Sequence, residues 1–233
     1  MAEAEGFRCP IPATHDKYQE AHYFIARMLS EYHHPDEFRW NLNAFLQALR
    51  SVTFMVQSEM AHVEGFQGWY SGQQELMRAD PLLRVFVEGR DIVVHKGMLN
   101  HRSTIEVGLF RGRSTFKLGF TDIEASPDMS SQVALARAVE QLVGFILDEE
   151  HSAIGEQIGV RRLWLVEELG DGEVIRLCDR AWSRIGNVVA SAHAVLGARF
   201  EPPPEEGHDV EAVRVLLESD VDPSLPRKWG WVD

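Results

Sequence analysis

The fold is decided by a long helical pattern near the start of the chain. Residues 36–56 read DEFRWNLNAFLQALRSVTFMV. Their apolar members recur at intervals of three and four residues, and they are Phe38, Leu42, Phe45, Leu49, Val52 and Val56. That spacing places them along one side of a helix. A long helix with a single apolar stripe predicts packing in a helical bundle.

Shorter patterns on both sides of this helix predict a mainly α fold with one inserted β-hairpin. Further helices are expected at about residues 14–33, 69–78, 81–96, 130–150 and 173–196, the first with Thr14 as its N-cap. Alternating apolar and polar residues from about 103 to 121 surround the turn Arg111-Gly112-Arg113, which predicts the hairpin. Residues 159–169 are apolar and fit a strand as well as a helix.

The composition suggests three successive parts. A loose leader is expected at residues 1–13, a helical domain that includes the hairpin at 14–200, and a proline-rich linker with a C-terminal tail at 201–233. Three prolines from Pro202 to Pro204 make this linker stiff. In the tail, residues 209–218 fit a short amphipathic helix, and two terminal tryptophans are expected to pack on the body.

Composition also excludes several classes of protein. No apolar run approaches the roughly 20 residues of a membrane span, and the first six residues lack the apolar core of a signal peptide. Cys9 and Cys178 are the two cysteines, too few for a disulfide scaffold or for a zinc site built on cysteines. We therefore expect a cytoplasmic protein that holds no metal and no cofactor.

The charge is unevenly distributed. The formal net charge is −13, which is unfavourable for a protein coated with nucleic acid. Residues 81–120, however, include seven basic residues and only three acidic ones. A basic segment on an acidic chain is compatible with an anionic ligand at one place.

That basic segment begins with the chain's most informative motif. Asp80-Pro81 is a good helix start, with a capping carboxylate followed by proline in the first turn. The helix that follows contains Arg90-Asp91-Ile92-Val93-Val94-His95. This arginine, polar residue, apolar run and histidine resemble the Arg-x4-6-His motif of the HEPN superfamily, over roughly residues 14–197.

The resemblance implies a fold, a chemistry and partners. The fold is an antiparallel helical bundle that forms a homodimer, and many members are metal-independent endoribonucleases. His95 would then be the acid or base for attack of a ribose 2′-OH, Arg90 would hold the phosphate, and Asp91 would orient its neighbours. RNA-binding residues would be Lys96, Arg84, Arg102, Arg111 and Arg113. A toxin–antitoxin or defence setting, with an antitoxin or another protein partner, is also implied.

The motif has a plainer interpretation as well. Five residues of helix separate Arg90 from His95 by about 140° and roughly 7.5 Å along the axis, so they converge only if the helix bends or a second subunit contributes. Arg90 can equally pair with Glu88 or Asp91, and His95 can end the helix, where a positive charge suits the helix dipole. The alternative function is a catalytically inactive module that binds a protein, nucleotide or RNA partner.

Other groupings carry less. Two Glu-x-x-His pairs, Glu31 with His34 and Glu59 with His62, are the units of di-iron bundles, but their separation along one helix is too large for a shared metal. His33-His34 is better explained as a polar helix end than as a metal site. Asp179, Ser183 and His193 share one helix, where their spacing does not make a catalytic triad.

Overall fold

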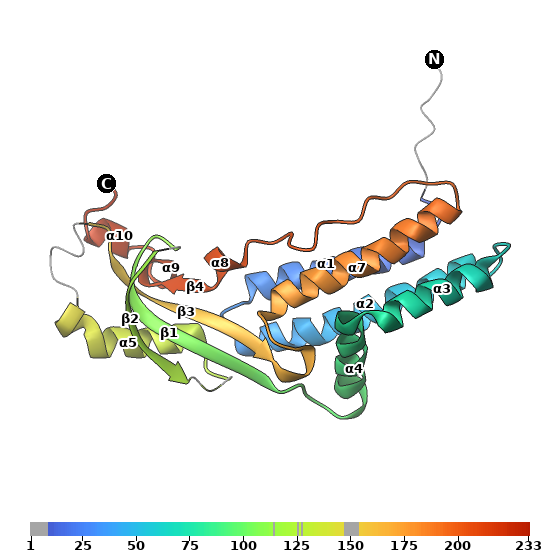
Figure 1. Cartoon of the computed structure of the whole chain (residues 1–233). Helices are drawn as coiled ribbons and strands as arrows, with labels where there is room; N and C mark the ends of the chain where they lie inside the picture. The colour runs from blue at the N-terminus through green and yellow to red at the C-terminus, as the bar shows by residue number, and fades with distance from the viewer. Residues whose placement is uncertain (1–8, 114, 125, 127, 147–153) are drawn as a thin grey trace, which may run out of the picture. The chain divides into compact units, whose positions relative to one another are not determined.

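The computed structural model describes residues 9–113, 115–124, 126, 128–146 and 154–233. It is mainly helical and contains a small antiparallel sheet (Figure 1), so the mainly α prediction is confirmed. No helix in the described ranges is both long and apolar enough to cross a membrane.

The two N-terminal helices are α1 (Pro12–Ser30) and α2 (Pro35–Met60). All six residues of the predicted α2 stripe are buried, which confirms the pattern from residues 36–56. The predicted cap of α1 was wrong, because the helix begins at Pro12 and Thr14 lies inside its first turn. The carboxylate of Glu59 instead accepts hydrogen bonds from the backbone N–H groups of Ala13 and Thr14, at 2.9 and 2.7 Å. A side chain distant in sequence therefore satisfies the donors that a helix start leaves free.

Two shorter helices follow, α3 (Phe66–Ala79) and α4 (Pro81–His95). The boundary between them confirms the prediction from Asp80-Pro81. One Asp80 carboxylate oxygen accepts hydrogen bonds from the N–H groups of Leu82 and Leu83, at 2.8 and 3.2 Å, and Pro81 occupies the first turn. The helix after Asp80 thus starts where sequence alone places it.

The sheet contains the strands β1 (His101–Arg111), β2 (Thr115–Glu124), β3 (Gln157–Val166) and β4 (Val215–Leu217), in the order β2-β1-β3-β4. The predicted hairpin is confirmed as β1 and β2. It is part of a larger sheet rather than a lone insertion, because β1 also pairs with β3 along almost its whole length. The ambiguous stretch at 159–169 is thereby resolved as strand β3 and a short 3-10 helix, η1 (Glu167–Leu169).

Helix α5 (Ser131–Ile146) supplies the core beside this sheet. Ala134, Leu135 and Ala138 form one buried cluster with apolar residues of β1 and β3. The strand residues in the cluster are Ile105, Val107, Leu109, Ile158 and Val160. Alternation in the strands and helical spacing in α5 place both sets on one interface. The last four residues of the helix predicted for 130–150 lie outside the described residues.

The C-terminal part contains α7 (Val174–Val195), α8 (Val210–Val213), α9 (Glu218–Val221) and α10 (Leu225–Lys228). The helix predicted for 209–218 was wrong in its second half, because the chain leaves α8 and pairs with β3 as strand β4. Trp229 and Trp231 are partly buried, with ring centroids 4.6 Å apart.

The chain forms two compact units, each assembled from three separate segments. The first unit comprises residues up to Ala26, Asn41–Leu99 and Arg176–Gly207. The second unit comprises Arg27–Trp40, Asn100–Ile175 and His208–Asp233. The boundaries expected at residues 13/14 and 200/201 both fall inside segments of the first unit. Whether residues 14–200 form an independent domain stays a prediction.

Candidate functional site

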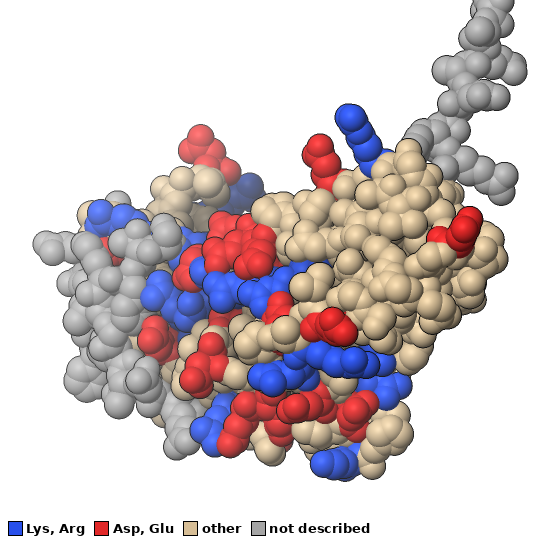
Figure 2. Space-filling view, turned by 45° about the vertical axis from the view of Figure 1, so that its right-hand side comes forward, with Lys and Arg blue, Asp and Glu red and all other residues tan. Residues whose placement is uncertain are grey.

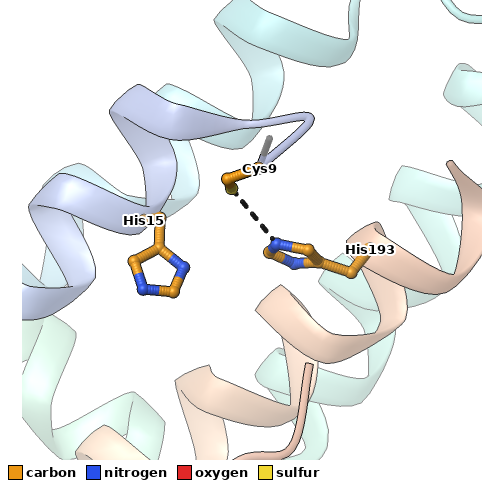
Figure 3. A group of neighbouring side chains, drawn as sticks. All are labelled: Cys9, His15 and His193. Atoms are coloured by element: carbon orange, nitrogen blue, oxygen red, sulfur yellow. Dashed lines mark hydrogen bonds between the residues drawn. The ribbon is translucent and has the colours of Figure 1, made fainter. Parts of the chain in front are cut away.

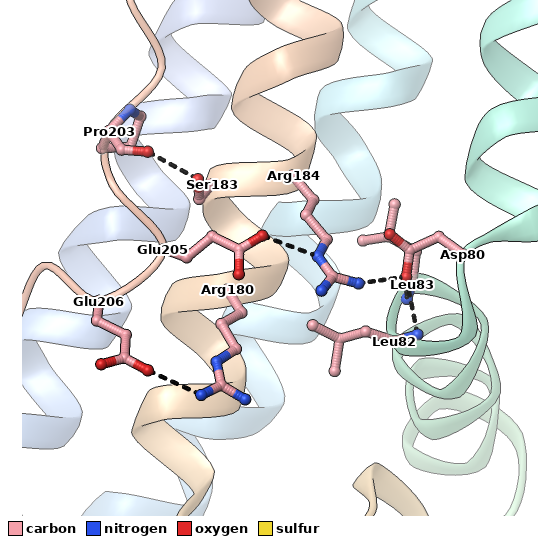
Figure 4. A network of polar contacts seen from close by, with 9 residues as sticks. All are labelled: Asp80, Leu82, Leu83, Arg180, Ser183, Arg184, Pro203, Glu205 and Glu206. Atoms are coloured by element: carbon pink, nitrogen blue, oxygen red, sulfur yellow. Dashed lines mark hydrogen bonds and ion pairs between the residues drawn. The ribbon is translucent and has the colours of Figure 1, made fainter.

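The start of α4 is fixed by a polar network within the first unit (Figure 4). Arg184 of α7 donates from Nη1 to the Asp80 carboxylate over 2.6 Å, on the same oxygen that caps α4. Its Nε donates to Glu205 over 3.3 Å. One arginine therefore joins the N-cap of α4, the middle of α7 and the segment that follows α7.

That last segment, residues 201–206, is called the strap. The Ser183 hydroxyl donates to the carbonyl oxygen of Pro203 over 2.7 Å, and Arg180 pairs with Glu206 over 2.8 Å (Figure 4). The predicted linker is thus held on α7 at three successive places. Because Ser183 bonds the strap, the structure gives no support to a nucleophilic role for it.

A pocket of about 280 Å³ opens beside α4 in the same unit. Residues of α2, α3 and α4 line it, together with one residue of α7. Its floor is apolar and buried, and consists of Leu49, Tyr70, Leu83, Phe86 and Ile185. The remaining lining is more polar and includes Arg50, Thr53, Gln74, Arg78, Arg84 and Glu88. We call this cavity the arginine pocket.

The charge of the arginine pocket is opposite to that of the chain. Three arginines and one glutamate line it, whereas the net charge of the chain is −13. Arg50 is held in place, since it donates to the Thr53 hydroxyl over 3.0 Å and lies 4.6 Å above the ring of Phe54. Arg78 and Arg84 are exposed, and their side chains make no hydrogen bond or ion pair with any residue that the structure describes. Two free guanidinium groups beside a third, positioned one suit an anionic group.

Charges of both signs are mixed on the face of the molecule that Figure 2 shows. On the face shown in Figure 2, Lys and Arg side chains are interspersed with Asp and Glu side chains. Opposite charges at close range neutralise one another, and salt screens what remains. That face therefore carries no broad basic surface.

The residues of the Arg-x4-His motif lie on the last turns of α4. Arg90 donates from Nη1 to its neighbour Asp91 over 3.0 Å, with 29% of its side chain exposed. His95 is exposed and ends the helix. These are the two features that the plainer interpretation of the motif anticipated, a surface ion pair and a histidine at a helix end.

The two motif residues do not converge within one chain. Helix α4 is continuous through His95, so the separation of about 140° between the two side chains is preserved. The backbone turns at Gly97, which has a φ of 119°, and this residue lies beyond the histidine. The bend therefore comes too late to bring His95 towards Arg90.

The other predicted RNA-binding residues are divided between the two units. Arg84 lines the arginine pocket, and Lys96 is the exposed C-cap of α4. In the second unit Arg102 pairs with Glu167 at 3.0 Å and Arg111 with Glu156 at 3.1 Å. Arg113 pairs with Asp220 and donates to the carbonyl oxygen of Val215 over 2.8 Å. All three are already engaged by carboxylates, which lowers their attraction for phosphate.

The Glu-x-x-His pairs also have structural roles. Glu59 caps α1, as described above, and His34 lies 3.0 Å from Glu31 across one helical turn. His33 contacts the hydroxyl of Ser131 through Nδ1 at 2.9 Å. These contacts give Glu59, His34 and His33 structural roles of their own.

Sequence reasoning missed the arginine pocket. Of its arginines, only Arg84 was assigned to ligand binding, and it was assigned for its proximity to the motif. Arg50 and Arg78 come from two other helices, and no local pattern marks either one. Only the packing of α2, α3 and α4 brings the three together.

Fold and pocket together define a mainly helical protein with a small antiparallel sheet and a basic pocket with an apolar floor. Residues 3–215 match the family model described as bacteriophage lambda protein ea47. The chain belongs to this family. It is 27% identical over 162 residues to protein ea47 of Escherichia phage lambda, an alignment that covers 68% of this chain and 38% of that relative. No solved structure matches the chain.

The family match corrects the assignment to the HEPN superfamily. That assignment was wrong, because the matched family spans the Arg-x4-His motif and both sides of it and is a different one. The physical reason for the error is the low information in the motif. An arginine and a histidine five residues apart occur often by chance. Here Arg90 forms an ion pair with Asp91, and His95 is the last residue of α4.

Proposed function

We propose that the protein is a binding module for a small phosphate-bearing ligand of the mononucleotide class, held in the arginine pocket. The carrying observation is the concentration of Arg50, Arg78 and Arg84 around an apolar floor in an acidic chain. The proposal develops the binding alternative drawn from the sequence and does not depend on the rejected family assignment.

The chemistry of the lining favours this class of ligand. An arginine fork bonds two oxygens of one phosphate and stays charged at every physiological pH. The aromatic side chains of Tyr70 and Phe86 in the floor suit a flat base, while Gln74 and Glu88 offer polar partners for its edge. The volume of about 280 Å³ lies near the lower end of the range for ligand pockets, which favours a mononucleotide over a larger ligand.

The test is a calorimetric titration of the full chain with the four ribonucleoside 5′-monophosphates, the matching nucleosides and inorganic phosphate. One nucleotide is expected to bind more tightly than its nucleoside, and more weakly as salt is raised. Arg84→Gln and Arg78→Gln should each weaken binding by roughly 10-fold, the value of one charge-assisted hydrogen bond. Arg199→Gln is the matched control, since Arg199 is exposed in the same unit and is not among the residues that line the pocket.

Three results would contradict the proposal. If Arg84→Gln and Arg199→Gln bind every ligand with equal affinity, the binding site lies outside the arginine pocket. Absence of binding by the folded chain would remove the function. Binding of inorganic phosphate as tightly as any nucleotide would reduce the pocket to an anion site with no use for its floor.

Ribonuclease activity stays a prediction of the sequence, as do the homodimer, the RNA target and the antitoxin partner. The geometry favours it less than ligand binding, because Arg90 and His95 point apart on one continuous helix. A shared centre would need a second copy of the chain.

A further inference from the structure

Three side chains that the proposed function does not use come together in the first unit. They are Cys9 in the segment before α1, His15 in the first turns of α1, and His193 in the last turn of α7 (Figure 3). Each offers one ligand atom, and these atoms all lie within 4.8 Å of one another. The Cys9 sulfur is 3.4 Å from Nε2 of His193.

The tautomer of His193 is set by a backbone contact. Its Nδ1 lies 2.9 Å from the carbonyl oxygen of Val189, so Nδ1 carries the proton and donates it. Nε2 therefore keeps its lone pair, and this is the atom that faces Cys9. Metal-binding histidines are usually oriented in this way, with the second ring nitrogen donating to a carbonyl or a carboxylate.

His15 offers the second imidazole of the cluster, and its Nε2 lies 3.4 Å from the side-chain amide nitrogen of Gln19. Its Nδ1 is buried and has no hydrogen-bond partner among the residues that the structure describes. With the Gln19 amide turned so that its oxygen accepts from Nε2–H, Nδ1 keeps the lone pair that a metal ion needs. A buried nitrogen without a partner is costly, so the site gains when an acceptor of electron pairs occupies it.

An aromatic side chain holds both rings. Phe200 is stacked on His193 with ring centroids 5.3 Å apart, and it meets His15 edge-on at 5.4 Å. Packing of this kind restricts the rotation of both imidazoles. The two nitrogen ligands are therefore largely positioned before any ion arrives, which reduces the entropy lost on binding.

We propose that Cys9, His15 and His193 form a zinc site with three protein ligands. One thiolate and two neutral imidazoles are the donor set that favours tetrahedral Zn²⁺. Zinc bonds of about 2.0–2.3 Å place such ligands roughly 3.3–3.7 Å apart, so the cluster needs to contract by about 1 Å along its longest separation. The Cys9 thiol releases its proton as the S–Zn bond forms. The fourth position is open to water or to a donor atom from a bound molecule.

This proposal revises the argument from the number of cysteines. Two cysteines exclude a site built mainly from thiolates, but one cysteine with two histidines is a complete set for a three-ligand site. His193 and Cys9 are 184 residues apart in sequence. No spacing rule can find such a site, because rules of that kind depend on ligands that are near in sequence.

The first experiment measures zinc binding by the full chain after removal of metals with a chelator. Zn²⁺ is titrated in competition with a chromophoric chelator, and Co²⁺ is used as a spectroscopic substitute. We expect one ion per chain, release of a proton on binding, and a thiolate-to-cobalt charge-transfer band. Because the site joins the start of α1 to the end of α7, zinc at 100 times its Kd should raise the Tm by about 5–10 °C.

Matched variants locate the site. Cys9→Ser and His15→Gln should each weaken zinc binding by roughly 100-fold or more, and Cys9→Ser should abolish the charge-transfer band. Cys178→Ala and His62→Gln are the controls, a cysteine and an exposed histidine outside the cluster, and should bind zinc as the wild type does. Cys9 and His15 are only partly buried, so these variants are expected to fold, which circular dichroism checks.

Two results would overturn the proposal. One is a folded wild-type chain that binds no zinc in the micromolar range, which would leave the Cys9–His193 contact as a hydrogen bond within the helical packing. The other is zinc binding that survives in the Cys9→Ser/His15→Gln double variant. Neither result depends on the arginine pocket, so the two proposals fail or succeed separately.

Discussion

Two histidines of the first unit show how differently the same side chain can be placed. His95 ends α4 and is exposed, and its imidazole has no hydrogen-bond partner among the described residues. His193 is 2% exposed on α7, and both of its ring nitrogens have partners. His95, which belongs to the Arg-x4-His motif, is therefore positioned only by its own helix. His193, to which the sequence assigned no role, is held by Cys9, Val189 and Phe200. Of the two, only His193 has surroundings that fix its ring, as the proposed zinc site requires.

The largest expected effect is the difference in stability between the variants His193→Ala and His95→Ala. His193→Ala removes a buried ring, its bond to Val189 and its stacking on Phe200, and should lower the free energy of unfolding by about 2–4 kcal/mol in the absence of metal. His95→Ala should change it by no more than about 0.5 kcal/mol. Urea unfolding of both variants in the presence of a chelator measures the difference. Equal losses in the two variants would contradict the distinction.

A third histidine, in the second unit, extends the comparison to pH. Burial is the main cause that lowers the pKa of His33 to about 4 from its ordinary value of 6.5. Between these two values the unfolded chain binds more protons than the folded one, so stability falls as the pH falls through this window. The loss is up to about 3 kcal/mol between pH 7 and pH 4.

Urea unfolding from pH 7 to pH 4 measures this loss. The slope of stability against pH should be reduced in His33→Gln and unchanged in His62→Gln, the exposed control. An identical slope in the His33 variant and in the wild type would mean that other groups cause the acid sensitivity.

A smaller effect is expected where α4 is anchored. Arg184→Ala breaks the ion pairs with Asp80 and Glu205, and should cost about 1 kcal/mol because both pairs are partly exposed. Asp80→Ala also removes the cap of α4 and should cost about 1–2 kcal/mol. Arg180→Ala, which breaks only the exposed pair with Glu206, should cost less than either. Thermal unfolding ranks the three variants, and a larger loss in Arg180→Ala would show that the strap rather than the cap controls stability.

The smallest expected effect concerns the motif. A single-chain centre made of Arg90 and His95 is disfavoured by geometry, so the folded protein should cleave RNA no faster in EDTA than a mock preparation does. Arg90→Ala and His95→Ala should leave that background unchanged. Metal-independent cleavage that both substitutions abolish would instead establish the ribonuclease predicted from the sequence, and would require two copies to share a site.

Most of the secondary structure was predictable, because it depends on local signals. The α2 stripe, the start of α4 at Asp80-Pro81 and the β1–β2 hairpin each follow from periodicity, capping or turn chemistry. The predictions were wrong where residues distant in sequence determine the local structure. Glu59 caps α1 from the end of α2, and β4 exists only because β3 offers it an edge. Neither partner can be recognised in a window of neighbouring residues.

The candidate sites were less predictable for the same reason. The arginine pocket draws on three helices, and the proposed zinc ligands Cys9 and His193 come from opposite ends of the first unit's sequence. The Arg-x4-His motif, by contrast, lies within six residues and can be recognised from a short stretch of sequence. A motif is easy to recognise when its residues are close in sequence. That closeness does not show whether the side chains come together in the fold.

The division of each unit among three chain segments has a consequence for biosynthesis. The first unit lacks α7 until residues 174–195 have emerged from the ribosome, and the second lacks strand β4 until residues 215–217 have emerged. Side chains of the early helices that pack on α7, such as Tyr18 against Trp182, therefore lack these partners while most of the polypeptide is made. At 5–20 residues per second this interval is roughly 10–30 seconds, long enough for chaperones to bind the nascent chain. No single cut in the gene yields either unit whole, so fragments expressed for study would have to be supplied together.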